Sequence, residues 1–150
     1  MPAAENVESE VACFGLFFNE EILTKIEAST NKNVDNMIQS MNQKQREYVR
    51  TTASWIKATS VSELKAYFGL MIYRGVYQWS YQAVEKFWTE VPIFESTMSI
   101  RRFYFLNRNI SFDDKETRAD RWTRDRGAAV REVFEEWNEL LGQAVYVGKV

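Results

Sequence analysis

The stretch from Ser60 to Gly75, SVSELKAYFGLMIYRG, decides the fold class of this chain of 150 residues. Ser60 and Glu63 have the spacing of a capping box, in which two side chains satisfy free backbone N–H groups at the start of a helix. Apolar side chains then recur three, four, seven and eight residues apart, at Leu64, Tyr67, Phe68, Met71 and Ile72. These spacings predict an amphipathic helix over residues 61–74, with Gly75 as its stop.

Most of the remaining chain also carries helical patterns. Asn19 is a good N-cap for a helix that extends through Thr30, because acidic side chains follow it in the first turn. Further helices are expected between Ser80 and Pro92, over 100–109 behind the N-cap Ser99, and over 128–144. The tail 145–150 is β-branched and aromatic around a glycine, which is typical of a strand. The predicted fold class is therefore mainly α, a multi-helix region that ends at the start of a strand.

Composition excludes several classes of protein. The single Cys13 cannot form an internal disulfide, and the chain has no histidine, so a zinc finger or ribbon cannot be assembled. No apolar run has the length of a membrane span, and the first ten residues lack the pattern of a secretory signal. We therefore expect a soluble intracellular protein without a cofactor or metal ion of its own. It should consist of a disordered leader over 1–12 and one helical domain over 13–150, in which the apolar stripes of the helices over 61–74 and 128–144 form one core.

Charge is unevenly distributed along the chain. The formal net charge is -2, yet residues 101–131 hold nine basic and five acidic side chains, and eight of the nine are arginines. Clustered arginines bind phosphates in a bidentate way, although they are also common on solvated helix faces, where they pair with nearby acids. The candidate contacts to the DNA backbone are Arg101, Arg102, Arg108, Arg121, Arg124, Arg126 and Arg131.

Other residue groups have alternative interpretations. Tyr73, Tyr77, Trp79, Tyr81 and Trp88 could stack on single-stranded DNA, but core packing is the favoured interpretation. Asp113 and Asp114 look like a pair of metal ligands, but they follow a helix without a third acid nearby, so a surface turn or a cap is favoured. The glutamates at 132, 135, 136 and 139 are expected on the solvated face of the last helix.

The order of these motifs resembles the N-terminal part of the piggyBac-type transposases and of proteins derived from them. The resemblance rests on FGLFFNEEILTKIEAST (14–30) followed by Asn31, ELKAYFGLMIYRG (63–75), FW (87–88), MSIRRF (98–103), LNRNISFDD (106–114) and DRGAAVREVF (125–134). Four positions depart from the family pattern: Ile100 and Arg101 stand where Arg and Asp are usual, and Gly127 and Ala129 stand where Leu and Pro are common.

The resemblance implies a function for this region. In the family, such helices dimerise the transposase and bind the terminal inverted repeats of duplex DNA in the nucleus. A strand that follows them carries the first of three catalytic Asp residues, which hold Mg²⁺ in an RNase H-like domain. The chain ends at Val150, where that strand would begin, so we expect no catalytic residue and no catalysis here. The alternative function is a host-adopted protein-interaction or regulatory module without a role in transposition.

Overall fold

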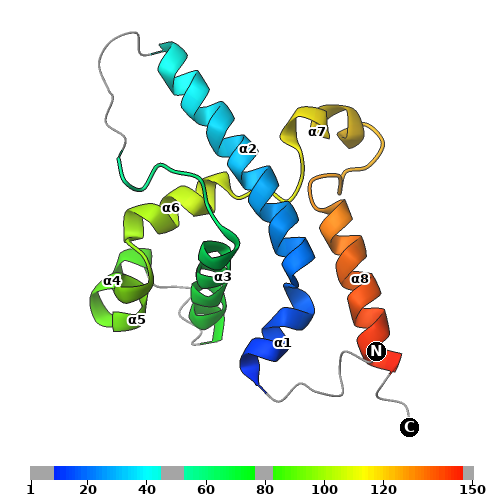
Figure 1. Cartoon of the computed structure of the whole chain (residues 1–150), viewed down its shortest axis with the longest axis horizontal. Helices are drawn as coiled ribbons and strands as arrows, with labels where there is room; N and C mark the ends of the chain where they lie inside the picture. The colour runs from blue at the N-terminus through cyan, green and yellow to red at the C-terminus, as the bar shows by residue number, and fades with distance from the viewer. Residues whose placement is uncertain (1–8, 45–52, 77–82, 147–150) are drawn as a thin grey trace. The chain divides into compact units, whose positions relative to one another are not determined.

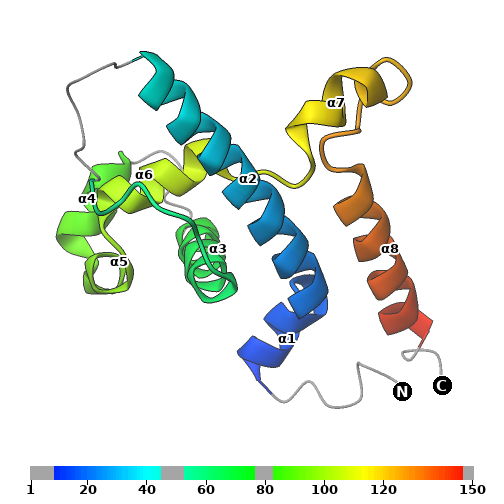
Figure 2. The same cartoon turned by 45° about the horizontal axis from the view of Figure 1, so that its top comes forward.

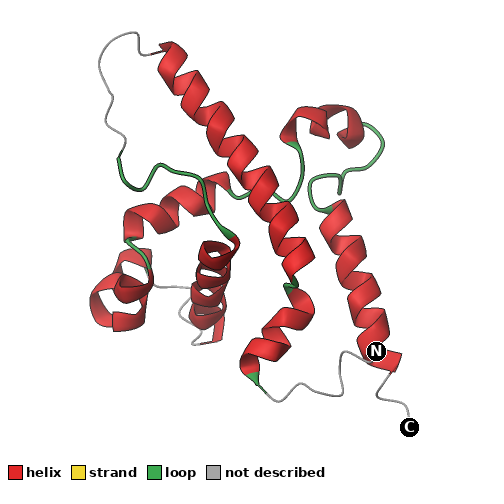
Figure 3. Ribbon diagram, viewed as in Figure 1, coloured by secondary structure: helices red, strands yellow, loops and turns green. Residues whose placement is uncertain are grey.

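A computed structural model describes residues 9–44, 53–76 and 83–146 of the chain. All regular secondary structure in these ranges is helical, which confirms the mainly α prediction (Figures 1 and 3). The helices are α1 (Glu10–Phe17), α2 (Glu20–Lys44), α3 (Val61–Val76), α4 (Val84–Glu90), α5 (Pro92–Thr97), α6 (Ile100–Asn109), α7 (Lys115–Trp122) and α8 (Arg131–Tyr146). Among the described helices, none combines the length and the apolar character that crossing a bilayer requires.

The chain divides into two compact units. One unit comprises Met1–Ser29 and Ser111–Val150, and the other comprises Thr30–Ile110. The sequence analysis expected a single core made by the helices over 61–74 and 128–144. Instead, α3 lies in the Thr30–Ile110 unit and α8 in the other unit. Within its unit, α3 packs against α4 to α6 through Tyr67 and Leu70, whereas Met71 and Ile72 of the predicted stripe are exposed.

The core of the Thr30–Ile110 unit is aromatic. Its buried members come from α3 to α6 and the turn after α5: Tyr67, Leu70, Phe87, Phe94, Met98, Phe103 and Leu106. Trp88 packs against Phe103 with ring centroids 4.8 Å apart, and its indole Nε1 donates to the carbonyl of Met98 at 2.8 Å. The short helices α4 and α5 lie side by side (Figures 1 and 2) and enclose this core.

In the other unit, α1 and α8 pack together through an aromatic contact. The rings of Phe18 and Trp137 meet edge to face at 5.7 Å, and Trp137 Nε1 donates to the carbonyl of Phe17 at 2.6 Å. The side chains of Ile22, Leu23, Ile26 and Val133 are fully or almost fully buried. Of the apolar residues predicted for the last helix, Val133 and Trp137 therefore pack within this unit, whereas Val130 and Phe134 are exposed.

Several helix boundaries differ from the sequence predictions. α1 begins at Glu10, within the leader predicted to be disordered, because the Ser9 Oγ accepts from the backbone N–H of Ala12 at 3.2 Å and caps the helix. α2 continues past Thr30 to Lys44, since the side chains of Asn31 and Asn33 bond to other segments and do not cap its end. The predicted leader residues 1–8 lie outside the described residues.

Pro92 and Asp114 start two helices, α5 and α7, that the sequence analysis did not predict. Pro92, predicted only to end a helix, also occupies the first turn of α5, where a missing N–H has no consequence. Asp114 caps α7 by accepting from the N–H of Glu116 at 2.9 Å. At the C-terminal end, α8 includes Val145 and Tyr146, so the predicted strand is wrong there, and 147–150 lie outside the described residues, as does Ser80.

Candidate functional site

Arg102, one of the predicted phosphate contacts, is buried inside the Thr30–Ile110 unit with 4% of its surface exposed. Its Nε and Nη2 donate to the two carboxylate oxygens of Glu63 at 2.8 and 2.6 Å. The other three N–H groups reach the backbone carbonyls of Trp55, Lys57 and Ala58 at 2.8 to 3.0 Å. A guanidinium has five N–H donors. All of them are used within the chain, so Arg102 has a structural role and we remove it from the set of phosphate contacts.

The Glu63 side chain pairs with Arg102 and does not complete the capping box that the sequence predicts. The Ser60 Oγ still accepts from the N–H of Glu63 at 3.3 Å, so half of the predicted capping box forms. The Glu63 carboxylate binds Arg102 and the Thr59 hydroxyl, which donates to it at 2.8 Å. Partial burial alone would raise the pKa of Glu63, but the hydrogen bonds from Arg102 and Thr59 outweigh it and lower this pKa below its usual value.

Arg101 and Arg108 lie on the exposed part of α6. Within the described residues, neither makes an ion pair or a side-chain hydrogen bond. Seven residues correspond to nearly two full helical turns, so the two side chains leave the same face about 10.5 Å apart along the axis. Tyr104 lies between them, and its hydroxyl donates to Glu85 at 2.6 Å. α6 thus presents two free cations on one face.

In the other unit, the guanidinium groups of Arg121 and Arg118 make contacts within the chain. Both guanidinium groups bind the carboxylate of Asp113, whose side chain is 2% exposed, with Arg121 Nη2 2.8 Å from Oδ2. Arg121 also donates to the carbonyls of Asp114 and Ala128 at 3.0 and 3.2 Å. The hydrogen bond to Asp113 raises the pKa of Arg118. These contacts fix α7 against the segment before α8.

A turn after α7 exposes Arg124 and Arg126. Between them, Asp125 accepts a bidentate pair from Arg131, with both distances 2.8 Å, and a further bond from the N–H of Gly127 at 2.8 Å. The hydrogen bonds from Arg131 and Gly127 lower the pKa of Asp125 to about 2. Arg124 and Arg126 themselves make no ion pair or side-chain hydrogen bond within the described part of the chain. The turn is therefore held by Asp125 while its flanking cations stay free.

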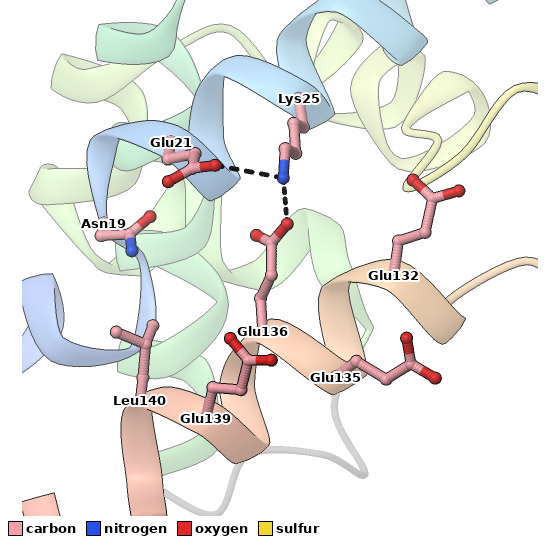
Figure 4. A pocket seen from close by; sticks show the side chains of 8 residues that line it. All are labelled: Asn19, Glu21, Lys25, Glu132, Glu135, Glu136, Glu139 and Leu140. Atoms are coloured by element: carbon pink, nitrogen blue, oxygen red, sulfur yellow. Dashed lines mark hydrogen bonds and ion pairs between the residues drawn. The ribbon is translucent and has the colours of Figure 1, made fainter. Parts of the chain in front are cut away.

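An acidic hollow of about 460 Å³ lies in the same unit, between the start of α2 and α8 (Figure 4). Its walls carry glutamates at 21, 132, 135, 136 and 139, and Lys25 is the cation among them. Lys25 bridges Glu21, at 3.3 Å, and Glu136, and the bond to Glu136 raises its pKa despite some desolvation. No cluster of potential metal ligands is present among the described residues. Because its charge is negative, this surface repels a phosphate backbone.

The structure therefore divides the predicted phosphate contacts into three groups. Arg101, Arg108, Arg124 and Arg126 are exposed without partners among the described residues. Arg121 and Arg131 are exposed in part and hold Asp113 and Asp125. Arg102 is buried. The four free cations lie in different units, two on α6 and two on the turn after α7, so each pair is considered by itself.

Two other predictions can be compared with the structure. Core packing is confirmed for Tyr73 and Trp88, which pack against Phe94 at 5.8 and 5.1 Å, while Tyr77, Trp79 and Tyr81 lie outside the described residues. Asp114 is a cap, as predicted, but Asp113 is not at the surface, because two arginines draw its carboxylate inward. Sequence reasoning missed the role of Arg118. The signal in the sequence for the pair of Arg118 with Asp113 was their separation of five residues.

Comparison with known proteins gives a family and a fold. The model of a family described as Transposase IS4 matches residues 9–149. Among solved structures, the chain is similar to one described as a cryo-EM structure of a piggyBac transposase synaptic complex with hairpin DNA, with a TM-score of 0.77 and 23% sequence identity. The match covers 93% of this chain and 28% of that transposase. No curated protein matches the sequence. The predicted resemblance to piggyBac-type transposases is thereby confirmed.

Proposed function

Because the chain belongs to the Transposase IS4 family, we propose that it is the DNA-binding and dimerisation portion of a piggyBac-like transposase or of a protein derived from one. It acts in the nucleus on duplex DNA, including terminal inverted repeats, and performs no strand cleavage itself. The fold shared with a transposase that was solved in a complex with DNA supports this proposal.

The observation that carries the proposal is the presence of exposed arginines without internal partners. Arg101 and Arg108 on α6 illustrate it, since every donor of each guanidinium is available within the described structure. Guanidinium groups that leave one helix face about 10.5 Å apart along its axis can both contact phosphates of a duplex. Such contacts position the protein on DNA and carry no sequence information.

The acidic hollow between α2 and α8 acts against DNA binding. Its glutamates and the formal net charge of -2 repel a phosphate backbone, so affinity has to come from local patches of free cations. The proposal thus expects affinity that falls steeply with salt and that is carried by a few arginines.

The test is titration of the purified chain onto a mixed-sequence 30-base-pair duplex at increasing salt. We expect measurable binding at about 50 mM salt and a linear fall of log affinity against log salt, by about 0.9 for each phosphate neutralised. A folded sample that does not bind the duplex at the lowest salt would contradict the proposal. It would favour the alternative function, a host-adopted interaction module.

The absence of catalysis is tested separately. We expect neither nicking nor joining of a duplex that carries a terminal inverted repeat when Mg²⁺ or Mn²⁺ is added. In a full-length relative, three Asp residues would hold Mg²⁺ for this chemistry. Cleavage by the chain that persists after Asp113→Ala and Asp114→Ala would place catalysis within this region and overturn that part of the proposal.

A further inference from the structure

An apolar groove of about 510 Å³ lies in the Thr30–Ile110 unit. α2 contributes Met37 and Met41, the segment before α3 contributes Trp55 and Ile56, and α6 contributes Phe105 to its apolar lining. Arg101, Tyr104, Arg108 and Asn109 of α6 complete it. Among the described residues that line the groove, none is acidic and none is a lysine. Met41 at its edge is 45% exposed, so apolar surface is accessible to solvent.

The groove walls are held by specific hydrogen bonds. Three of the five N–H donors of Arg102 fix the segment that carries Trp55 and Ile56. They bind the backbone carbonyls of Trp55, Lys57 and Ala58. Asn31 on α2 accepts from the N–H of Thr59 at 2.7 Å and donates to its carbonyl at 3.0 Å. Trp55 meets Phe105 edge to face at 5.9 Å. The groove is therefore formed before any ligand binds.

The composition of the groove is that of a protein-binding surface. Aromatic residues, methionine and arginine are enriched at the centres of protein interfaces, whereas lysine, glutamate and aspartate are depleted there. Methionines adapt to the shape of a partner, as they do in grooves that accept amphipathic helices. The two free guanidinium groups of Arg101 and Arg108 lie along one side of the groove. They select a partner whose acidic side chains are two helical turns apart.

A nucleobase fits this groove less well than an aliphatic or aromatic side chain does. Among the described lining residues, Asn109 is the one neutral amide, and its Nδ2 already donates to the carbonyl of Phe105 at 2.8 Å. The part of the groove formed by Met37, Ile56 and Phe105 offers no side-chain hydrogen-bond partner, so the edge of a base placed there would lose its bonds to water. A leucine or phenylalanine side chain carries no such penalty.

We propose that this groove binds an amphipathic helix of a partner protein, with apolar side chains at helical spacing in the groove and Asp or Glu side chains paired with Arg101 and Arg108. This binding does not depend on the proposed DNA contacts. Since the same two arginines are expected to contact phosphates, however, the helix would compete with duplex DNA at α6 and leave Arg124 and Arg126 unaffected.

The probe for this site is a displayed library of 20-residue helical peptides. The library is selected on the 150-residue chain and depleted on a Met41→Glu variant, whose exposed substitution places a charge at the groove edge without disturbing the buried core. We expect enriched peptides with apolar residues three, four and seven positions apart and with acidic residues beside them. Failure to enrich any peptide that distinguishes the two folded proteins overturns the proposal, and so does enrichment of basic or neutral peptides.

Affinity measurements on one enriched peptide separate the contributions. We expect Arg101→Gln with Arg108→Gln to weaken binding about tenfold or more, as loss of paired charges does. The matched control, Arg124→Gln with Arg126→Gln, removes the same charge from the other unit and should leave peptide affinity unchanged. Equal loss in both double variants contradicts the proposal. A twelve-nucleotide oligothymidylate provides a further test. If it binds the chain and Met41→Glu abolishes this binding, the groove accepts bases and the proposal is overturned.

Discussion

Arg102 on α6 forms a bidentate ion pair with Glu63 on α3, with Nη2 2.6 Å from Oε2 and Nε 2.8 Å from Oε1. The pair links two helices that are 39 residues apart in sequence. It also anchors the segment before α3 through three further hydrogen bonds. Arg102 therefore shapes the groove beside α6, while its neighbour Arg101 faces solvent.

The first prediction concerns the stability that depends on Arg102. Removing one partner of a buried pair costs about 3 to 5 kcal/mol, because it leaves a charge and several carbonyls without partners. We expect Arg102→Ala to lower the free energy of unfolding by about 3 kcal/mol, at the low end because Glu63 keeps 22% of its side chain exposed. The control Arg101→Ala should stay within about 0.5 kcal/mol. Equal urea midpoints for the two variants would refute the structural role of Arg102.

The second prediction concerns acid sensitivity. The pKa of Glu63 is lowered from its reference value of 4.5, so its charged form stabilises the folded state above that pH. This contribution is lost as the pH falls below 4.5 and through the lowered folded-state pKa. Glu63→Gln should therefore be less stable than the parent chain at neutral pH, and the difference should shrink on acidification. Unfolding curves at a series of pH values test this, and a difference that grows in acid would contradict it.

The third prediction concerns the aromatic core. Phe94 is buried, with 1% exposed, and contacts Tyr73, Phe87 and Trp88, so Phe94→Ala should cost about 3 to 5 kcal/mol. Phe134 on α8 is 49% exposed, and Phe134→Ala should cost much less. Thermal unfolding followed by circular dichroism compares the two. A smaller loss in the Phe94 variant would be incompatible with the described core.

The fourth prediction concerns the turn that exposes Arg124 and Arg126. The pKa of Asp125 is lowered to about 2, first by the hydrogen bond from Arg131 and then by that from Gly127. Arg131→Ala should raise it toward its reference value of 3.8, without reaching it while the Gly127 bond persists. Arg126→Ala should leave it unchanged. Carboxyl chemical shifts followed by NMR during acid titration measure both, and an unshifted Asp125 in the Arg131 variant would contradict the described pair.

Much of the helical fold could be predicted because local signals control helix formation. Ser99 caps α6, and Leu64 and Tyr67 of the predicted α3 stripe are buried, as their sequence patterns indicate. Met71 and Ile72, predicted for the same stripe, are exposed. The roles of the arginines could not be predicted in this way. Arg101 and Arg102 are adjacent and chemically identical, and only the tertiary position of Glu63 and the nearby carbonyls decides which one is buried. The groove was likewise missed, because it joins residues from Met37 to Asn109 that share no periodic pattern.

The most direct test of the central claim is the salt dependence of duplex binding in charge-matched variants. Arg101→Gln with Arg108→Gln removes the two free cations of α6. Lys65→Gln with Lys86→Gln removes the same charge from α3 and α4, where Lys86 pairs with Glu90 at 3.7 Å. The account predicts that the α6 variant loses affinity and that its log-log salt slope falls by up to about 1.8, since each phosphate contact contributes about 0.9. The lysine variant should keep both. Identical slopes for the two variants and the parent chain would contradict the account.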